Sequence, residues 1–496
     1  MILDGGIFIG RDPTQEIGGG DPLAALAPLG IGAALAASFK AAYFDVAEGN
    51  AELIAACRAS GGRLVPVAIL NPVAYDLDGD MLERLAAEGV KVIGLFPKFQ
   101  FDAWGWDNHV VRAIARKAAA LGLAVQAGLM TAAELGRCAP TIAGEGARLL
   151  VRWMKGSGYN ATADMVAVGR DFGSVLFDVS TTTQSGGIAF LAERLGAERL
   201  FIASGWPLTL PSPAHLVLRA ERLSEADRAL IQGGTLCRAL GLDLPVAACT
   251  DLPQDLWVRP KIDTHWHTSG WNIVEPRIGV EAMRADMDAL NYRFAVTSSI
   301  RALNYDLPAG NAETAAFCGA DPRVRGYVVI NPRRLDESLA EIERWRDDPR
   351  FVGLKTIQDF YGLDLDAPEY EPLLARAAEL DWPLMCHLGG LARTAARHPE
   401  ITFIAAHGTW RLREIAPYAN IYCDIATSTA LRQQVDLVEA VRLLGEDRVL
   451  FSCDGQLMHP AWTLGKLLDS GFSEAVLDKI FVANALRALP RLTGNR

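Results

Sequence analysis

Short, largely apolar runs alternate with longer amphipathic runs through the first half of the chain. Residues 65–70, 91–96 and 123–128 have the apolar character of strands that are buried on both faces. Residues 80–88 and 107–121, which lie between them, are rich in alanine, leucine and arginine at helical spacing. A strand followed by a helix, repeated in this way, predicts a parallel sheet with crossover helices. About eight such units in about 250 residues predict a (β/α)8 barrel.

The second half of the chain repeats the first half in its letters as well as in its pattern. Gly49-Asn50-Ala51-Glu52 recurs as Gly310-Asn311-Ala312-Glu313, and Asn71-Pro72 recurs as Asn331-Pro332. The matching positions in the two halves stay about 260 residues apart along the whole half, which chance matches of short words would not produce. We therefore infer a tandem duplication.

The joint between the two copies lies near residues 243–260. Pro245, Pro253 and Pro260 interrupt any helix in this stretch. The sequence thus predicts an α/β chain of two tandem (β/α)8 TIM-like barrels. The expected domains are residues 1–250 and residues 251–496.

Composition narrows the class of protein. The chain has 496 residues, of which 50% are hydrophobic and 22% charged, and its net charge is −11. This balance predicts a soluble globular protein and argues against nucleic acid or an anionic membrane as partners. The eight cysteines form no CxxC pair, which favours free thiols in a reducing compartment. The N-terminus lacks a basic leader, and the apolar stretch 22–39 is broken by proline and glycine, so we expect a cytoplasmic protein without a membrane span.

One motif carries candidate chemistry. Residues 261–268 read as a short buried strand that ends in His265 and His267. Side chains two residues apart on a strand share a face, so both imidazoles would project together and grip one metal ion. The alternative is a pair of surface histidines. Further ligands are needed to decide between them.

Other strand ends in the second copy supply such groups. Lys355, His387, His407 and Asp454 each end an apolar run, which is where a barrel of this kind places its catalytic residues. Most have a non-ligating counterpart in the first copy. The aligned pairs are His265 with Gly6, His267 with Phe8, Lys355 with Phe96, His387 with Gly128, and Asp454 with Gly205. Because packing demands should be similar in two copies of one fold, this difference favours a metal site in the second copy.

The combined motif, a strand-1 HxH with a strand-4 lysine, strand-5 and strand-6 histidines and a strand-8 aspartate, resembles the amidohydrolase superfamily. It is similar in particular to the amidohydrolase-related group, which includes metal-dependent hydrolases and aminocarboxymuconate-semialdehyde decarboxylase-like enzymes. The resemblance covers nearly all of residues 260–492, and the first half resembles the same fold without its ligands. It implies that His265, His267, His387 and Asp454 bind a divalent metal.

The resemblance also implies roles for these groups. An open coordination position would suit Zn²⁺ best, with Mn²⁺ or Fe²⁺ as alternatives. Asp454 would accept a proton from metal-activated water, and His407 would polarise or protonate the substrate. Lys355 would either be carboxylated and bridge two metals or remain an ammonium that binds an anionic substrate group. A single metal is the favoured arrangement.

The loops that follow these residues differ from the usual pattern of the group. His407 is followed by Gly408-Thr409-Trp410, and Asp454 by Gly455-Gln456. Arg301 follows the second strand, where the resemblance to related decarboxylases implies that it holds a substrate carboxylate through a bidentate contact; this slightly favours decarboxylation, and a surface arginine is an equal alternative. Trp266, Trp271 and Trp410 would wall the pocket, or else serve core packing.

These features lead to three functional hypotheses. The leading one is a metal-dependent hydrolase that cleaves an amide, lactone or related bond of a small molecule, with carboxylate-bearing compounds among the candidates. The alternative is a metal-dependent decarboxylase of an unsaturated or aromatic acid, and the third hypothesis is a non-catalytic ligand-binding protein. We expect the first half to serve as a pseudo-subunit, which would make the chain an internal pseudo-dimer, with further oligomerisation left open.

Overall fold

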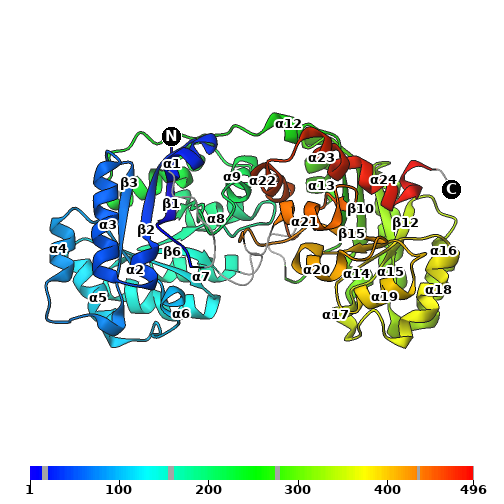
Figure 1. The fold of residues 1–496 in the computed structure, drawn as a ribbon, viewed down its shortest axis with the longest axis horizontal. Helices are drawn as coiled ribbons and strands as arrows, with labels where there is room; N and C mark the ends of the chain where they lie inside the picture. The colour runs from blue at the N-terminus through cyan, green and yellow to red at the C-terminus, as the bar shows by residue number, and fades with distance from the viewer. Residues whose placement is uncertain (14–20, 155–160, 274–279, 433–435, 495–496) are drawn as a thin grey trace. The chain divides into compact units, whose positions relative to one another are not determined.

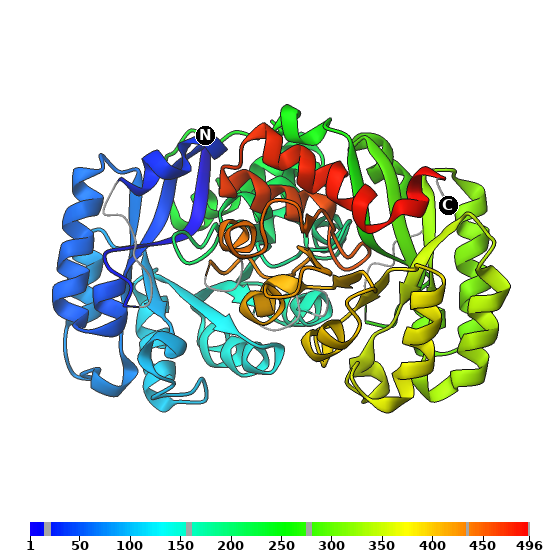
Figure 2. The ribbon, with the colours of Figure 1, turned by 45° about the vertical axis from the view of Figure 1, so that its right-hand side comes forward.

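The computed structural model describes residues 1–13, 21–154, 161–273, 280–432 and 436–494. The chain divides into two compact units, Met1–Leu252 and Pro253–Arg496, which we call the first and the second barrel. Each unit holds one eight-stranded parallel sheet whose neighbours follow chain order, with helices around it (Figures 1 and 2). The prediction of two tandem TIM-like barrels is therefore confirmed.

Eight strands and their crossover helices build the first barrel. The backbone amides of Gly5 and Phe8 donate to Ile202 O (2.7 Å) and Trp206 O (2.9 Å), so the first strand meets the chain after the eighth and closes the sheet. The strands are β1 (Ile2–Ile9), β2 (Ile31–Ser38), β3 (Leu64–Ile69), β4 (Val92–Leu95), β5 (Ala124–Met130), β6 (Arg148–Met154), β7 (Val175–Asp178) and β8 (Leu200–Phe201). The helices are α1 (Pro22–Leu26), α2 (Phe39–Tyr43), α3 (Val46–Ala59), α4 (Met81–Ala87), α5 (His109–Ala120), α6 (Ala132–Ile142), α7 (Ala161–Asp171), α8 (Gly187–Leu195), α9 (Ser212–Ala220), α10 (Glu225–Ala229) and α11 (Thr235–Leu240).

The second barrel repeats this order and closes in the same way. Thr264 N donates to Phe451 O and His267 N to Gly455 O, both at 3.2 Å. The strands are β9 (Lys261–Thr268), β10 (Tyr292–Ser299), β11 (Val324–Val329), β12 (Phe351–Lys355), β13 (Leu384–Cys386), β14 (Phe403–Ala405), β15 (Ile421–Asp424) and β16 (Val449–Leu450). The helices are α12 (Gln254–Trp257), α13 (Val280–Ala289), α14 (Ile300–Asn304), α15 (Leu307–Ala320), α16 (Leu335–Trp345), α17 (Gln358–Tyr361), α18 (Glu371–Glu379), α19 (Leu391–Arg397), α20 (Leu412–Ile415), α21 (Leu437–Leu444), α22 (Pro460–Ser470), α23 (Glu474–Asp478) and α24 (Asn484–Ala488).

The repeated Gly-Asn-Ala-Glu sequence has the same structural task in both barrels. A Cβ at Gly49 would lie 2.6 Å from Ala41 Cα, and one at Gly310 would lie 2.5 Å from Ala302 Cα, so each glycine lets two helices approach closely. The asparagine that follows binds the end of the third strand. Asn50 bonds both the N–H and the C=O of Ile69, as Asn311 does with Val329. The duplicated letters therefore encode duplicated packing.

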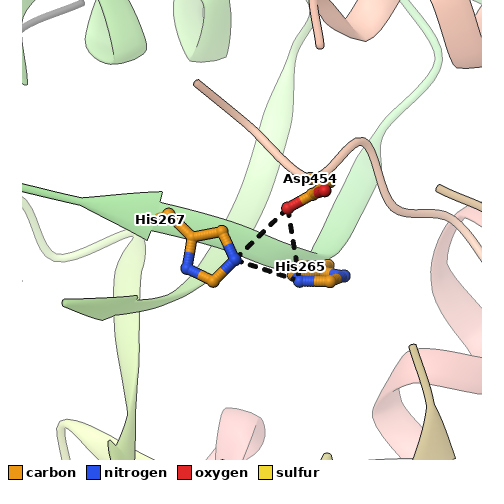
Figure 3. Close-up of side chains that lie close together, drawn as sticks. All are labelled: His265, His267 and Asp454. Carbon is orange, nitrogen blue, oxygen red and sulfur yellow. Dashed lines mark hydrogen bonds and ion pairs between the residues drawn. The ribbon is translucent and has the colours of Figure 1, made fainter. Parts of the chain in front are cut away.

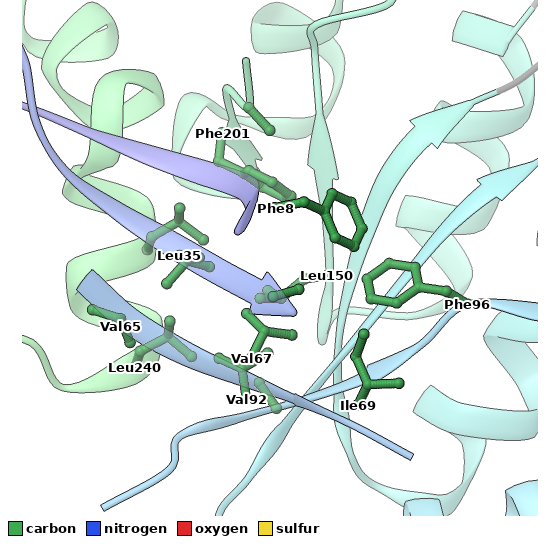
Figure 4. Close-up of a cluster of buried hydrophobic side chains, with 14 of the residues drawn as sticks. Phe8, Leu35, Val65, Val67, Ile69, Val92, Phe96, Leu150, Phe201 and Leu240 are labelled. Atoms are coloured by element: carbon green, nitrogen blue, oxygen red, sulfur yellow. The ribbon is translucent and has the colours of Figure 1, made fainter. Parts of the chain in front are cut away.

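A cluster of apolar side chains packs inside the first barrel (Figure 4). Leu35, Val67 and Leu150 form the middle of this core. Above them the Phe8 ring meets Phe96 edge-on, with 5.8 Å between ring centroids. Phenyl rings thus occupy the strand ends at which the second barrel carries histidine and lysine.

Among the described residues, we find no helix with both the length and the apolar character needed to cross a membrane.

Candidate metal centre

Three side chains converge at the carboxyl-terminal end of the second barrel (Figure 3). His265 and His267 come from β9, and Asp454 follows β16. The two Nε2 atoms are 3.2 Å apart, and Asp454 Oδ1 lies 3.4 Å and 3.2 Å from them. All three side chains are buried, and their ligand atoms lie within 4.8 Å of one another. We call these three residues the central cluster.

Local backbone structure explains this convergence. Alternation along β9 turns His265 and His267 to the same face. Asp454 reaches them from a left-handed backbone with φ of 54°. The Gln456 side chain secures the end of β9, because its Nε2 donates to the carbonyls of His267 (3.0 Å) and Ser269 (2.8 Å). The unusual residue after Gly455 therefore supports the site.

Both imidazoles are held by contacts to their second nitrogen. Asp424 Oδ2 accepts from His265 Nδ1 at 2.5 Å, while Asp424 Oδ1 accepts from Ala426 N at 2.6 Å and from the Ser452 hydroxyl. His267 Nδ1 lies 3.2 Å from Ser298 Oγ. Each ring thus presents Nε2 to the central cluster. Sequence reasoning did not single out Asp424, and the available signal was the match of Cys423-Asp424 to Phe177-Asp178 in the first copy.

Electrostatics favour neutral imidazoles beside an ionised carboxylate. Burial lowers the pKa of His265 to about 3 and also lowers that of His267. Burial opposes the ionisation of Asp454, but His265 and the other nearby histidines bring its pKa below the ordinary value. Lys355 Nζ lies 3.0 Å from His265 Nε2, and burial lowers the lysine pKa to about 8 against the charges of Asp454 and Asp424.

Two further predicted histidines lie next to the central cluster. The His407 ring is 5.3 Å from the His265 ring, and its Nε2 is 3.9 Å from Asp454 Oδ2. The His387 ring is 5.3 Å from the His407 ring, and its Nδ1 contacts Asp359 Oδ2 at 2.7 Å. This contact directs His387 Nε2 away from Asp359. His387 is not one of the residues whose ligand atoms lie within 4.8 Å of one another, which are His265, His267 and Asp454.

The structure does not bring every predicted substrate contact to the site. Arg301 is exposed and pairs with Asp306 at 3.6 Å. Trp266 points to the opposite face of β9 from its neighbouring histidines and packs against Gly455 and the Tyr292 ring, where it is 2% exposed. A role in the pocket wall is therefore replaced by core packing for Trp266, because alternation along the strand turns it outward.

Two other tryptophans do lie beside the site histidines. Trp410 is 56% exposed and stacks on the His407 ring, with 5.4 Å between centroids and 26° between planes. Trp271 meets the His267 ring edge-on at 6.0 Å. Each of these two tryptophans therefore contacts a histidine of the site.

The residues of the central cluster fit a divalent metal ion. Two imidazole nitrogens and a carboxylate oxygen are donors that Zn²⁺, Mn²⁺ and Fe²⁺ accept. Asp454 Oδ1 is buried, and among the described residues no group donates a well-aligned hydrogen bond to it; burial without a donor is costly for a carboxylate oxygen. A cation between the three donors would provide that partner.

Comparison with known proteins adds a family and a set of similar structures. A family model described as amidohydrolase matches residues 262–491. Comparison with curated proteins found no match.

Three similar structures illustrate the range of activities in their names. A 5-carboxyvanillate decarboxylase from Novosphingobium aromaticivorans, complexed with manganese and 4-hydroxy-3-methoxy-5-nitrobenzoic acid, is 17% identical, with 48% of this chain and 100% of that chain covered at a TM-score of 0.41. A dihydroxybenzoic acid decarboxylase from Polaromonas, with bound manganese and 2-nitroresorcinol, is 19% identical. The match covers 48% of this chain and 98% of that chain, with a TM-score of 0.38. A probable 2-pyrone-4,6-dicarboxylic acid hydrolase from Acinetobacter baumannii is 13% identical. The match covers 46% of this chain and 99% of that chain, with a TM-score of 0.37. The residues that match the amidohydrolase family model, 262–491, lie in the second barrel, which also carries the central cluster.

Proposed function

We propose that the second barrel is a metal-dependent hydrolase of a small molecule, which cleaves an amide, lactone or related bond. The observation that carries this proposal is the convergence of His265, His267 and Asp454 on one buried point, where Asp454 Oδ1 faces both Nε2 atoms and no described group donates a well-aligned hydrogen bond to it. A donor set of this kind is costly to bury unless a cation joins it.

His265, His267 and Asp454 would hold the metal, and His387 would be a further ligand through Nε2. We propose Zn²⁺, because nitrogen-rich sites with a carboxylate suit it, with Mn²⁺ or Fe²⁺ as alternatives. When bound, such an ion activates water and polarises a carbonyl group. Asp454 Oδ2 would accept the proton of the attacking water. His407 Nε2, which is 3.9 Å from that oxygen, would pass a proton to the leaving group.

Lys355 would bind an anionic group of the substrate. Its ammonium lies at the floor of the site, fully buried and 3.0 Å from His265 Nε2. A buried cation in this position is compensated best by an anion that enters with the substrate. We therefore propose a substrate with a carboxylate close to the scissile bond.

A substrate screen with an isotope measurement tests the proposal. The full chain, loaded with Zn²⁺ or Mn²⁺, is incubated with carboxylate-bearing amides and lactones in H₂¹⁸O. We expect one class to be cleaved with a single ¹⁸O atom in the product. Turnover without incorporation of solvent oxygen contradicts hydrolysis.

The buried Lys355 also favours a second candidate, non-oxidative decarboxylation of an unsaturated or aromatic acid. In that reaction Lys355 would hold the departing carboxylate, and Asp454 or His407 would protonate the carbon that is left. Arg301, which the sequence offered in support of this reaction, is turned to Asp306 instead. Release of CO₂ without ¹⁸O in the organic product would favour the decarboxylase over the hydrolase.

A further inference from the structure

Asp424, at the end of β15, contacts the central cluster through a hydrogen bond with His265. Its side chain is fully buried, and its two oxygens have different tasks. Oδ1 accepts from Ala426 N and from Ser452 Oγ, which fixes the carboxylate. Oδ2 is then aimed at His265 Nδ1, 2.5 Å away.

We propose that Asp424 is a positioning residue, which holds His265 in the tautomer that carries its proton on Nδ1 and so turns the Nε2 lone pair to the central cluster. This inference rests on the proposed metal site. A carboxylate behind a ligating imidazole fixes the ring and raises its basicity, and loss of such a partner typically lowers metal affinity about 10- to 100-fold.

The first barrel offers a matched control within the same chain. Asp178 ends β7 as Asp424 ends β15, and it is equally buried. Its Oδ1 accepts from the backbone amides of Ser180 (2.8 Å) and Ala203 (3.0 Å). The residue equivalent to His265 in this barrel is Gly6. Asp178→Asn therefore changes the position equivalent to Asp424 in a barrel that has no imidazole beside it.

The test measures Zn²⁺ affinity of the full chain by competition with a chromophoric chelator, and the visible absorption of the Co²⁺ form. Asp424→Asn should weaken Zn²⁺ binding about 10- to 100-fold and alter the Co²⁺ bands, while Asp178→Asn changes neither. Should Asp424→Asn not fold, Ser452→Ala is measured instead, and we expect a smaller loss of affinity in the same direction.

Each outcome has a distinct meaning. The positioning role is overturned if a folded Asp424→Asn protein shows wild-type Zn²⁺ affinity and wild-type Co²⁺ bands. The same result in Ser452→Ala, where that variant is used, also overturns it. In either case the metal site itself remains supported. A wild-type chain that binds neither ion overturns the metal site itself, and the positioning role with it.

A separate observation concerns the first barrel, where the Arg152 guanidinium lies against Gly6. Arg152 comes from β6, is fully buried, and donates from Nη2 to Gly6 O at 2.5 Å. A Cβ at Gly6 would lie 2.5 Å from Arg152 Nε and Nη1, so no side chain fits there while the guanidinium is in place. The guanidinium also lies over the Phe8 ring, 5.2 Å from its centroid. Gly6 and Phe8 are the counterparts of His265 and His267.

Two buried acids also lie close enough to act on the Arg152 charge. The charges of Asp178 and Asp4 act on it and oppose the effect of burial, which lowers its pKa to about 10, so the guanidinium stays charged at neutral pH. We infer that Arg152 is a built-in cation of the first barrel, which takes the space of the first metal-ligand side chain and makes a divalent metal both unnecessary and impossible there.

A double-mutant cycle of thermal stability tests this inference without any metal. Gly6→His should lower Tm strongly, because the new side chain collides with Arg152, and Arg152→Ala should lower it by leaving two buried acids uncompensated. In the combined variant the two losses should be less than additive, since Arg152→Ala removes the side chain with which the new histidine collides. Arg194→Met, at an exposed arginine that also lies 5.2 Å from a phenyl centroid, is the control and should leave Tm unchanged.

Metal stoichiometry gives the second readout. Zn²⁺ that remains bound to a His265→Ala variant and disappears on Asp178→Asn would place a metal in the first barrel and overturn the inference. Fully additive losses of Tm in the cycle would overturn it as well.

Discussion

Asp454 and Gly205 share a left-handed backbone at the end of the eighth strand, with φ of 54° and 67°. Glycine adopts this conformation freely, whereas a residue with a side chain is strained there by about 1 kcal/mol or more. The first barrel has the unstrained glycine, and the second barrel, which holds the central cluster, has the carboxylate. The strain is the cost of aiming Asp454 Oδ1 at both histidines.

Asp454→Gly should therefore separate stability from metal binding. In the metal-free protein we expect a free energy of unfolding equal to that of the wild type or higher by up to about 1 kcal/mol, because backbone strain and a buried carboxylate are both removed. Metal binding should be lost. Urea unfolding of the chelator-treated proteins measures the first effect, and a marked loss of stability would show that Asp454 has a structural role instead.

The duplicated asparagines should contribute equally to the two barrels. Asn50→Ala and Asn311→Ala each leave a buried N–H and C=O at the end of the third strand without their side-chain partners. We expect each change to reduce the free energy of unfolding of its barrel by about 1–3 kcal/mol. Chemical unfolding of the single variants checks this, and an effect confined to one barrel would contradict the equivalence of the two repeats.

Lys466 should make stability depend on pH. Burial lowers its pKa from 10.5 to about 7, although Nζ donates to the carbonyl and hydroxyl of Thr427. Between these two values the unfolded chain binds a proton that the folded chain does not, so stability should rise as pH increases from about 7 to about 10.5. Lys466→Met should flatten this rise, whereas Lys479→Met, at a partly exposed lysine that pairs with Glu446 and Asp447, should retain it. A rise of equal slope in Lys466→Met would contradict the assignment.

His407 should affect turnover more than metal content. Its Nε2 is near Asp454 Oδ2, while its Nδ1 contacts Ala426 O at 2.5 Å, which fixes the ring. If it moves a proton in the rate-limiting step, His407→Asn should lower kcat about 10²- to 10⁴-fold with nearly wild-type metal content. His398→Asn, at a histidine that pairs with Glu371 away from the site, is the control. Loss of metal in His407→Asn would make His407 a ligand instead.

Much of the fold followed from the sequence because parallel barrels leave a local record. Apolar strands, amphipathic helices and a repeated Gly-Asn pair are all visible in short windows. The carboxyl ends of parallel strands meet at one face, so strand-end histidines that are far apart in sequence were expected to lie together. His265, His267 and Asp454 do so.

The contacts that position these residues were not predictable in the same way. Asp424 reaches His265 across 159 residues, and Arg152 reaches Gly6 across 146, with no local pattern to mark either pair. Arg301 was placed by analogy with related enzymes, and its direction toward Asp306 depends on the turn that begins α14. For Trp266 the alternation that pairs its two neighbours already implied an outward side chain.

Metal content of the full chain, purified without added metal and measured by elemental analysis, tests the central claim most directly. We expect about one divalent ion per chain, lost in the His265→Ala and His267→Ala variants and retained in His398→Ala. Less than about 0.5 ion per chain that Zn²⁺ or Mn²⁺ does not restore, or an ion that survives both substitutions in β9, would contradict a metal centre at the central cluster.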